Sequence, residues 1–133
     1  MSYDSRLGPR PGSTLRGEET TLIRKMLADQ ISGRWVPQAR MQHFIPKERM
    51  TVEYLKGFYF GQGEGFTRIS RLGFSHRPLT PYWRSAATFL KHRFLYEWKR
   101  HGHDSPAAVR HLIASSKALG SLRERLRPFT QEP

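Results

Sequence analysis

Three successive stretches after Pro46 repeat their apolar residues at intervals of three and four, and this spacing is the strongest constraint on the fold. The stretches are residues 50–72, about 81–100 and about 106–126. A spacing of three and four residues places side chains on one face of an α-helix. Thr80-Pro81 and Ser105-Pro106 add a capping residue followed by proline where the second and third stretches begin. The sequence therefore predicts three helices in this part of the chain.

The part before Pro46 predicts less regular structure. Residues 1–17 are rich in Gly, Pro, Ser and Arg, which is typical of a loop. Residues 18–30 carry apolar side chains at helical spacing and predict one short amphipathic helix. Residues 34–45 partly alternate apolar with polar side chains, and we expect one strand or two short ones there, with Pro37 at an edge or bend. The expected fold class is thus mostly α with a short β segment.

The length of 133 residues suits one modest domain. The formal net charge is +12, of which residues 47–133 carry +9. Such a chain is drawn to the phosphate groups of nucleic acid, anionic lipid or a nucleotide, and charge alone does not choose among them. The absence of cysteine excludes disulfides and thiolate metal sites and fits a reducing, cytoplasmic setting. No apolar run approaches the roughly 20 residues that span a bilayer.

Four glycines interrupt the predicted helix at 50–72, and each costs about 1 kcal/mol relative to alanine. They are Gly57, Gly61, Gly63 and Gly65. We expect a kink or a close helix contact where they lie. A phosphate-cradling loop is the alternative, but the run lacks the third glycine of G-x-G-x-x-G and no strand precedes it.

Two sets of polar residues have both a structural and a chemical interpretation. Glu18 and Glu19 stand at the start of a predicted helix, where the free N–H groups stabilise acids, and either carboxylate also suits a general base. His101, His103 and Asp104 form an H-x-H-D cluster that suits either a divalent cation or a solvated turn.

An ordered set of motifs resembles the C-terminal part of the family 2 glycosyltransferases, which have the GT-A fold. The motifs are YDSRLGP at 3–9, GEETTLIRKML at 17–27 and WVPQARMQHFIPKERMTVEYL at 35–55. The family pattern has an aromatic-Asp loop, a Gly-Glu-Asp triplet opening a helix, Pro-x-Ala, a strand ending in His, and Pro-x-x-Arg. The resemblance covers about residues 3–65 and implies an α/β GT-A fragment over 1–46, followed by a basic helical extension over 47–133.

The resemblance implies a role for five residues. Glu19, the second acid of the triplet with Glu18 beside it, would be the catalytic base of an inverting sugar transfer. Gly17 and Arg49 would bind substrate, and His43 would ligate the Mg²⁺ or Mn²⁺ that holds the nucleotide diphosphate. From the residues alone, Arg49 suits either a phosphate or a nearby acid, and a lone His such as His43 also suits a packed or hydrogen-bonded position. The family usually has Asp where Glu19 stands, and the extra methylene moves the carboxylate by about 1 Å, a displacement that can cost about 10²-fold in rate.

The same resemblance implies partners that the sequence does not contain. Such enzymes have an N-terminal nucleotide-binding half with an acidic metal motif, and the aspartates here, Asp4, Asp29 and Asp104, do not form one. We therefore expect a truncated or split enzyme that is inactive alone and pairs with a separate half or with itself. Its donor would be a nucleotide-diphospho-sugar and its acceptor a glycan or lipid hydroxyl.

Two further interpretations remain open for the basic C-terminal helices. Trp83, Phe89, Phe94 and Trp98 lie among Arg and Lys, which suits either a helix at the inner face of the membrane or a hairpin packed on a catalytic domain. Alternatively, the chain is a small basic helical protein that binds nucleic acid or an anionic membrane surface.

Overall fold

The computed structural model describes residues 17–74, 79–101 and 105–128, and its elements are helical. In chain order they are α1 (Glu18–Ala28), the 3-10 turn η1 (Lys47–Arg49), α2 (Val52–Arg71), α3 (Tyr82–Arg100) and α4 (Ser105–Leu126). Each predicted helix is present within about two residues of its expected bounds, so the mostly α-helical class is confirmed.

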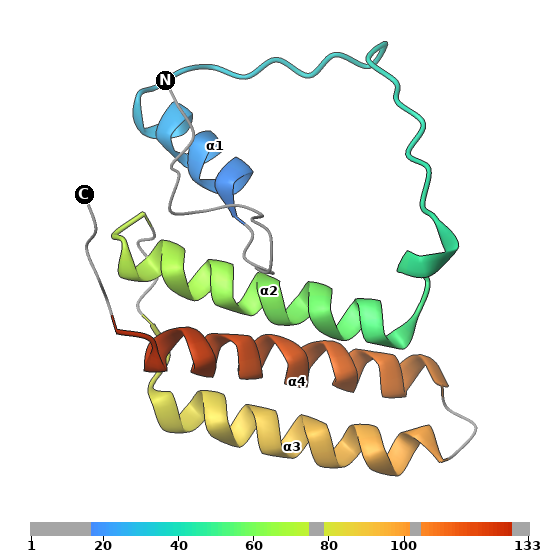
Figure 1. The fold of residues 1–133 in the computed structure, drawn as a ribbon. Helices are drawn as coiled ribbons and strands as arrows, with labels where there is room; N and C mark the ends of the chain where they lie inside the picture. Colours follow the sequence, from blue (N-terminus) through green and yellow to red (C-terminus); the bar gives the residue numbers. More distant parts are fainter. Residues whose placement is uncertain (1–16, 75–78, 102–104, 129–133) are drawn as a thin grey trace.

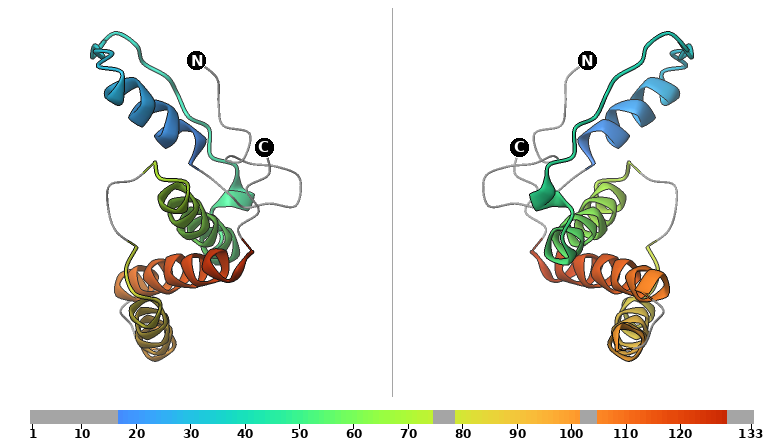
Figure 2. Two further views of the ribbon diagram at one scale, coloured as in Figure 1. Left: turned by 90° about the vertical axis from the view of Figure 1, so that its left-hand side faces the viewer. Right: turned by 90° about the vertical axis from the view of Figure 1, so that its right-hand side faces the viewer.

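The last helix in the chain is the centre of the molecule. α4 lies between α2 and α3, packs along both and crosses both at an angle, as Figures 1 and 2 show. The core therefore consists of two helix–helix interfaces. Among the described residues the core has few buried apolar side chains, and three of them are alanines. The buried apolar residues are Ile69, Tyr96, Ala107, Ala108, Leu112, Ala118 and Leu122. Within the described residues no helix combines the length and the apolar character needed to cross a membrane.

Glycines bring α2 and α4 into backbone contact. A Cβ atom added to Gly63 would lie 2.1 Å from the carbonyl oxygen of Lys117, and one added to Gly120 would lie 2.0 Å from that of Phe60. Both carbonyl oxygens are backbone atoms, so they cannot move aside as the end of a flexible side chain can. The predicted close packing of the glycine-rich helix is thus confirmed, and since Gly61, Gly63 and Gly65 are inside α2, no phosphate-binding loop exists there.

Two buried carboxylates lie beside this contact. Glu64 on α2 is 1% exposed and Glu124 on α4 is 0% exposed. Arginines surround both acids: Arg68 Nε lies 3.1 Å from Glu124, and Arg123 and Arg127 lie 3.5 and 3.6 Å from Glu64. Burial raises the pKa of the Glu124 carboxyl, the surrounding arginines oppose that shift, and Glu64 adds to it.

A fourth arginine, Arg71 of α2, lies 3.7 Å from the Glu124 carboxylate and also caps the C-terminus of α4. The Arg71 guanidinium donates hydrogen bonds to the backbone carbonyls of Glu124 and Arg127, at the C-terminus of α4. Such carbonyls have no partner within the helix, and a cation there also complements the helix dipole. The charged groups therefore fix the end of α4 against α2.

The expected β segment is wrong for the described residues. Residues 31–46 are extended or turn, without ladder hydrogen bonds, and arch away from the helices between α1 and η1 (Figure 1). A strand requires a neighbour to accept its backbone hydrogen bonds, and the described chain offers no second extended segment beside it. The apolar side chains of this arch are exposed: Ile31, Trp35, Val36, Met41, Phe44 and Ile45. The α/β GT-A assignment remains a prediction.

We predict that Gly63→Ala and Gly120→Ala each lower the free energy of unfolding by about 1–3 kcal/mol, because the added methyl overlaps a backbone carbonyl. Gly57→Ala is the matched control on α2, since a Cβ there meets nothing within 4 Å. That variant should gain up to about 1 kcal/mol from helix propensity. Urea unfolding followed by circular dichroism measures all three, and equal stability of the three variants would contradict the close contact.

Candidate functional site

The acid pair begins α1, as the sequence predicts. Glu18 is the first residue of the helix, and Glu19 lies in its first turn with an exposed side chain. Gly17 is the N-cap residue, and its carbonyl accepts hydrogen bonds from the backbone N–H and the hydroxyl of Thr21, each 3.0 Å long. Thr21 is 2% exposed, so the first turn is anchored by a buried side chain while Glu19 faces solvent.

The structure explains why position 17 is a glycine without invoking a substrate. Its φ of +130° lies in a region that side-chain-bearing residues rarely adopt. An added Cβ would also lie 2.6 Å from Cδ1 of Ile69 on α2. Gly17 thus allows the start of α1 to pack against Ile69 of α2. Its predicted role in substrate binding remains a prediction.

A second contact joins α1 to the segment just after α2. The Arg24 guanidinium donates a 2.8 Å hydrogen bond to the carbonyl of Phe74, just after α2 ends. Lys25 Nζ lies 5.4 Å from the centre of the Phe74 ring. The helix that carries Glu19 is consequently held at two points on the α2 side of the molecule.

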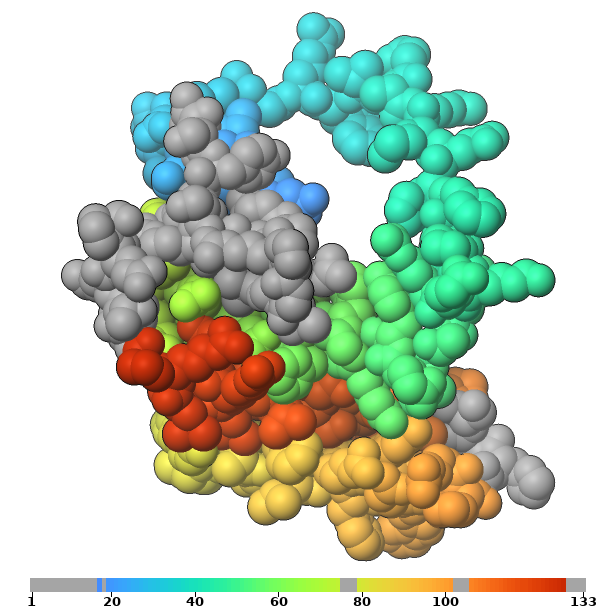
Figure 3. Space-filling view, viewed as in Figure 1, coloured from blue at the N-terminus to red at the C-terminus, as the bar shows by residue number. Residues whose placement is uncertain are grey.

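The other residues assigned by resemblance lie apart from the acid pair. His43 is exposed on the arch of residues 31–46, and Arg49 is exposed in η1, with its guanidinium 5.8 Å from the Tyr54 ring centre. The space-filling view shows an open gap between α1 and the descending limb of the arch (Figure 3). Neither Glu19 nor His43 lines the two grooves described below. The described structure therefore does not gather these residues into one cleft.

The described residues do not form a metal-binding cluster. Among the described residues, no group of three or more His, Asp or Glu side chains could hold a metal ion. His103 and Asp104 of the H-x-H-D cluster lie outside the described residues, so a cation site there remains a prediction.

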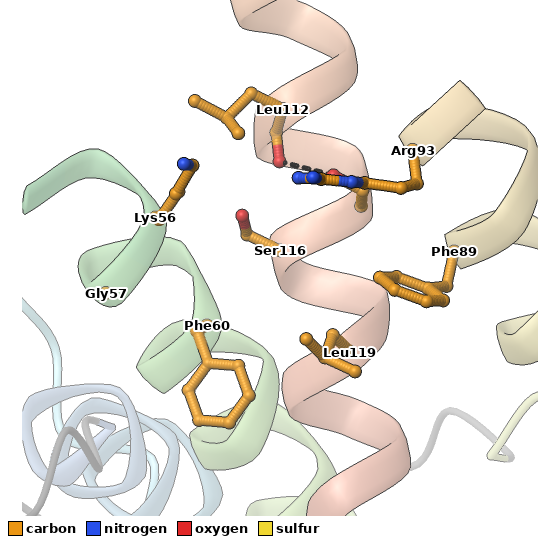
Figure 4. Close-up of a pocket in the computed structure, with 9 residues that line it drawn as sticks. Lys56, Gly57, Phe60, Phe89, Arg93, Leu112, Ser116 and Leu119 are labelled. Atoms are coloured by element: carbon orange, nitrogen blue, oxygen red, sulfur yellow. Dashed lines mark hydrogen bonds between the residues drawn. The ribbon is translucent and has the colours of Figure 1, made fainter. Parts of the chain in front are cut away.

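A groove runs between the three long helices, and sequence reasoning missed it. Figure 4 shows Phe60 of α2, Phe89 of α3 and Leu119 of α4 on its walls, with Lys56 and Arg93 near its mouth. Its volume is about 230 Å³, below the roughly 300–1,000 Å³ of ordinary ligand sites. Its residues come from three distant parts of the chain, and only small residues such as Gly57 and Ser116 hint that space remains between the helices.

A wider groove of about 520 Å³ lies along α4 and is lined by several hydroxyls. Many of these hydroxyls already bond within the protein. Thr67 Oγ1 donates to Ser121 Oγ at 2.8 Å, and Thr88 Oγ1 donates to a backbone carbonyl at 2.8 Å. Because these polar groups satisfy one another, they do not converge on a common point as the polar groups of a binding site do.

Two histidines meet between α3 and α4. His92 Nδ1 and His111 Nδ1 are 2.9 Å apart, so one ring donates a hydrogen bond and the other accepts it. Desolvation lowers the pKa of His92 below 6.5, and the charges of His111 and Lys91 lower it further. The fold therefore favours the neutral imidazole.

Comparison with known proteins gives no match: neither a protein-family model, nor a curated protein, nor a solved structure resembles the chain closely enough. The interpretation of the site therefore depends on the chain's own residues and on the motif resemblance.

We predict that the protein loses stability as the pH falls below about 6.5, the ordinary His value, and on through the lower pKa of folded His92. In that window the unfolded chain protonates His92 while the folded state, with its lowered pKa, resists protonation. The stability is fully present above the unfolded pKa and is lost below it. His92→Gln should reduce this slope, and His43→Gln, which alters an exposed imidazole, should not. Thermal unfolding at several pH values measures both; identical slopes for the two variants would contradict the assignment.

Proposed function

We propose that this chain is the C-terminal portion of an inverting sugar transferase of the family 2 glycosyltransferase type. Its donor is a nucleotide-diphospho-sugar, and its acceptor is a hydroxyl of a glycan or lipid. The observation that carries the proposal is the order and spacing of the motifs from Gly17 to Arg49, in which an acid pair opens a helix. The chain alone is inactive, and a nucleotide-binding half completes the site.

The mounting of α1 supports Glu19 as the base. A general base acts only when it is held within reach of the proton that it removes. Gly17 against Ile69 and Arg24 against the Phe74 carbonyl hold the start and middle of α1, while Glu19 stays accessible. In the proposed reaction, Glu19 takes the proton of the acceptor hydroxyl as its oxygen attacks the anomeric carbon. The nucleoside diphosphate leaves from the opposite face, which inverts that carbon.

The exposed arch supports the proposal that a separate nucleotide-binding half packs against this chain. Its apolar side chains include Trp35 at 86% exposure, Met41 at 89% and Phe44 at 85%. Exposed apolar groups in this number mark a surface that another body covers. An extended segment whose backbone forms turn but no ladder hydrogen bonds suits the edge of a sheet, which is the element that a nucleotide-binding half provides.

The metal that the resemblance implies would neutralise charge on the leaving diphosphate when bound. His43 is the ligand that the family pattern assigns to this chain, and the described residues hold no group of three ligands. These residues do not make a metal site by themselves. We therefore assign the remaining ligands to the other half and derive no step through the metal.

Nucleic-acid binding is the alternative function, and the ion pairs of the arginines count against that alternative. Arginines that would contact phosphates are already paired with acids: Arg68, Arg71, Arg123 and Arg127 with Glu64 or Glu124, and Arg93 and Arg100 with Glu97. These six guanidinium groups share three carboxylates, so they are less free to turn toward a polyanion than unpaired cations would be.

We predict that Glu19→Gln lowers sugar transfer by about 10²–10⁴-fold, because an amide cannot accept the acceptor's proton. Glu19→Asp, which supplies the family's usual residue, should raise it by up to about 10²-fold. The assay is nucleoside diphosphate release from donor sugars by this chain co-expressed with the nucleotide-binding half encoded upstream. Glu48→Gln, an exposed acid in η1, is the control and should keep full activity.

Two results would oppose this proposal. One is unchanged transfer by Glu19→Gln in an active preparation. The other is a coding sequence whose upstream frames contain no nucleotide-binding half with an acidic metal motif.

A further inference from the structure

The side of α3 that faces away from α4 is apolar and open to solvent. Trp83, Leu90 and Phe94 are each 65% exposed and Trp98 is 69% exposed, while Ala87 between them is also exposed. These five residues recur at intervals of three and four, so they form one stripe along the helix, which we call the α3 outer face. Phe94 and Trp98 meet edge to face with ring centres 6.0 Å apart.

The packing of the fold does not account for this stripe. α3 buries its opposite side against α4, through Ser85 and Tyr96 and the half-buried His92. A helix that only covered a core would be polar on its outer side. Here the outer side of α3 is apolar instead, and at the edge of the layer of helices it has no neighbour among the described elements (Figures 1 and 2).

Cations border the stripe on both flanks. The sequence of α3 contains five Lys or Arg residues and one acid, Glu97. Helical spacing places Arg84 and Lys91 along one flank, and Arg93 and Arg100 along the other. Both of the latter contact the Glu97 carboxylate at 2.5 Å. The α3 outer face therefore combines a narrow apolar band with an excess of positive charge, and its complement is apolar with a negative surface.

We propose that the α3 outer face binds the surface of an anionic lipid bilayer, with the helix lying in the plane of the interface. Trp rings favour the headgroup level, where an apolar ring and an N–H group are both accommodated. Long cationic side chains beside an apolar stripe, here Arg84 and Lys91 on the flank away from Glu97, reach lipid phosphates while their stems stay against the acyl region. This inference stands independently of the sugar-transfer proposal, because it requires no active site.

Other occupants fit the stripe less well. A second copy of the chain would bring two positively bordered faces together, which costs electrostatic energy. A nucleic acid would be contacted by cations in the middle of the face, where this helix has Leu90 and Phe94 instead. An anionic bilayer complements both the cations and the apolar stripe of the α3 outer face.

The test is co-sedimentation of the full chain with vesicles of phosphatidylcholine alone or mixed with phosphatidylglycerol. We expect binding to the mixed vesicles that is at least tenfold stronger and that weakens with salt. Trp98→Ser should reduce it at least tenfold, and Lys91→Gln roughly fivefold, near the usual effect of one cation at a charged bilayer. Trp35→Ser is the matched control, since Trp35 is also exposed but lies on the arch. Circular dichroism checks that each variant is folded.

The opposing outcomes are distinct. Equal affinity for the two vesicle types, or equal loss in Trp35→Ser and Trp98→Ser, would overturn the proposal. Duplex DNA binding that survives Trp98→Ser, with no vesicle binding, would indicate a nucleic-acid surface instead. A dimer in sedimentation equilibrium that Trp98→Ser dissociates, again without vesicle binding, would indicate a second copy. Failure of sugar transfer leaves all of these readouts unchanged, so the two proposals fail separately.

Discussion

The backbone contact between α2 and α4 is the constraint on which the rest of the structure depends. Gly63 and Gly120 let each helix touch the main chain of the other, which a single methyl group at either position would prevent. That approach removes Glu64 and Glu124 from water. A buried carboxylate is costly unless cations and hydrogen bonds surround it, so the arginines of both helices follow from the glycines. One steric requirement thus determines where much of the positive charge lies.

This arrangement gives the interface specificity more than apolar stabilisation. Only seven of the described apolar side chains are buried, and three of these are alanines. Removing one partner of the buried charge network would leave the other desolvated, which is far more costly than the net value of the pair. The register of α2 on α4 is consequently fixed by groups that tolerate little sliding. Ile69 of α2 also contacts Gly17, the N-cap residue of α1.

The sequence allowed the helices to be predicted because their information is local. Apolar spacing in α2, α3 and α4 needs no knowledge of any partner, and the glycine run correctly indicated a close contact. The strand over 34–45 was wrong because a strand depends on a neighbouring edge, and alternation alone cannot supply one. The groove between Phe60, Phe89 and Leu119 joins residues that are distant in the chain, so only the tertiary structure displays it. The pairing of His92 with His111 escaped prediction for the same reason.

The two exposed apolar surfaces lie on opposite sides of the molecule and have different characters. In Figure 1, α1 and the arch lie beyond α2, whereas α3 lies beyond α4. The arch presents apolar side chains on extended backbone, which suits a protein edge, and the α3 outer face presents them on a closed helix bordered by cations, which suits lipid. If both proposals hold, a chain resting on a bilayer through α3 would present Glu19 on the side away from the membrane. Its acceptor hydroxyl would then have to project well beyond the headgroups, which favours the sugar end of a lipid-linked glycan over a hydroxyl at the bilayer surface.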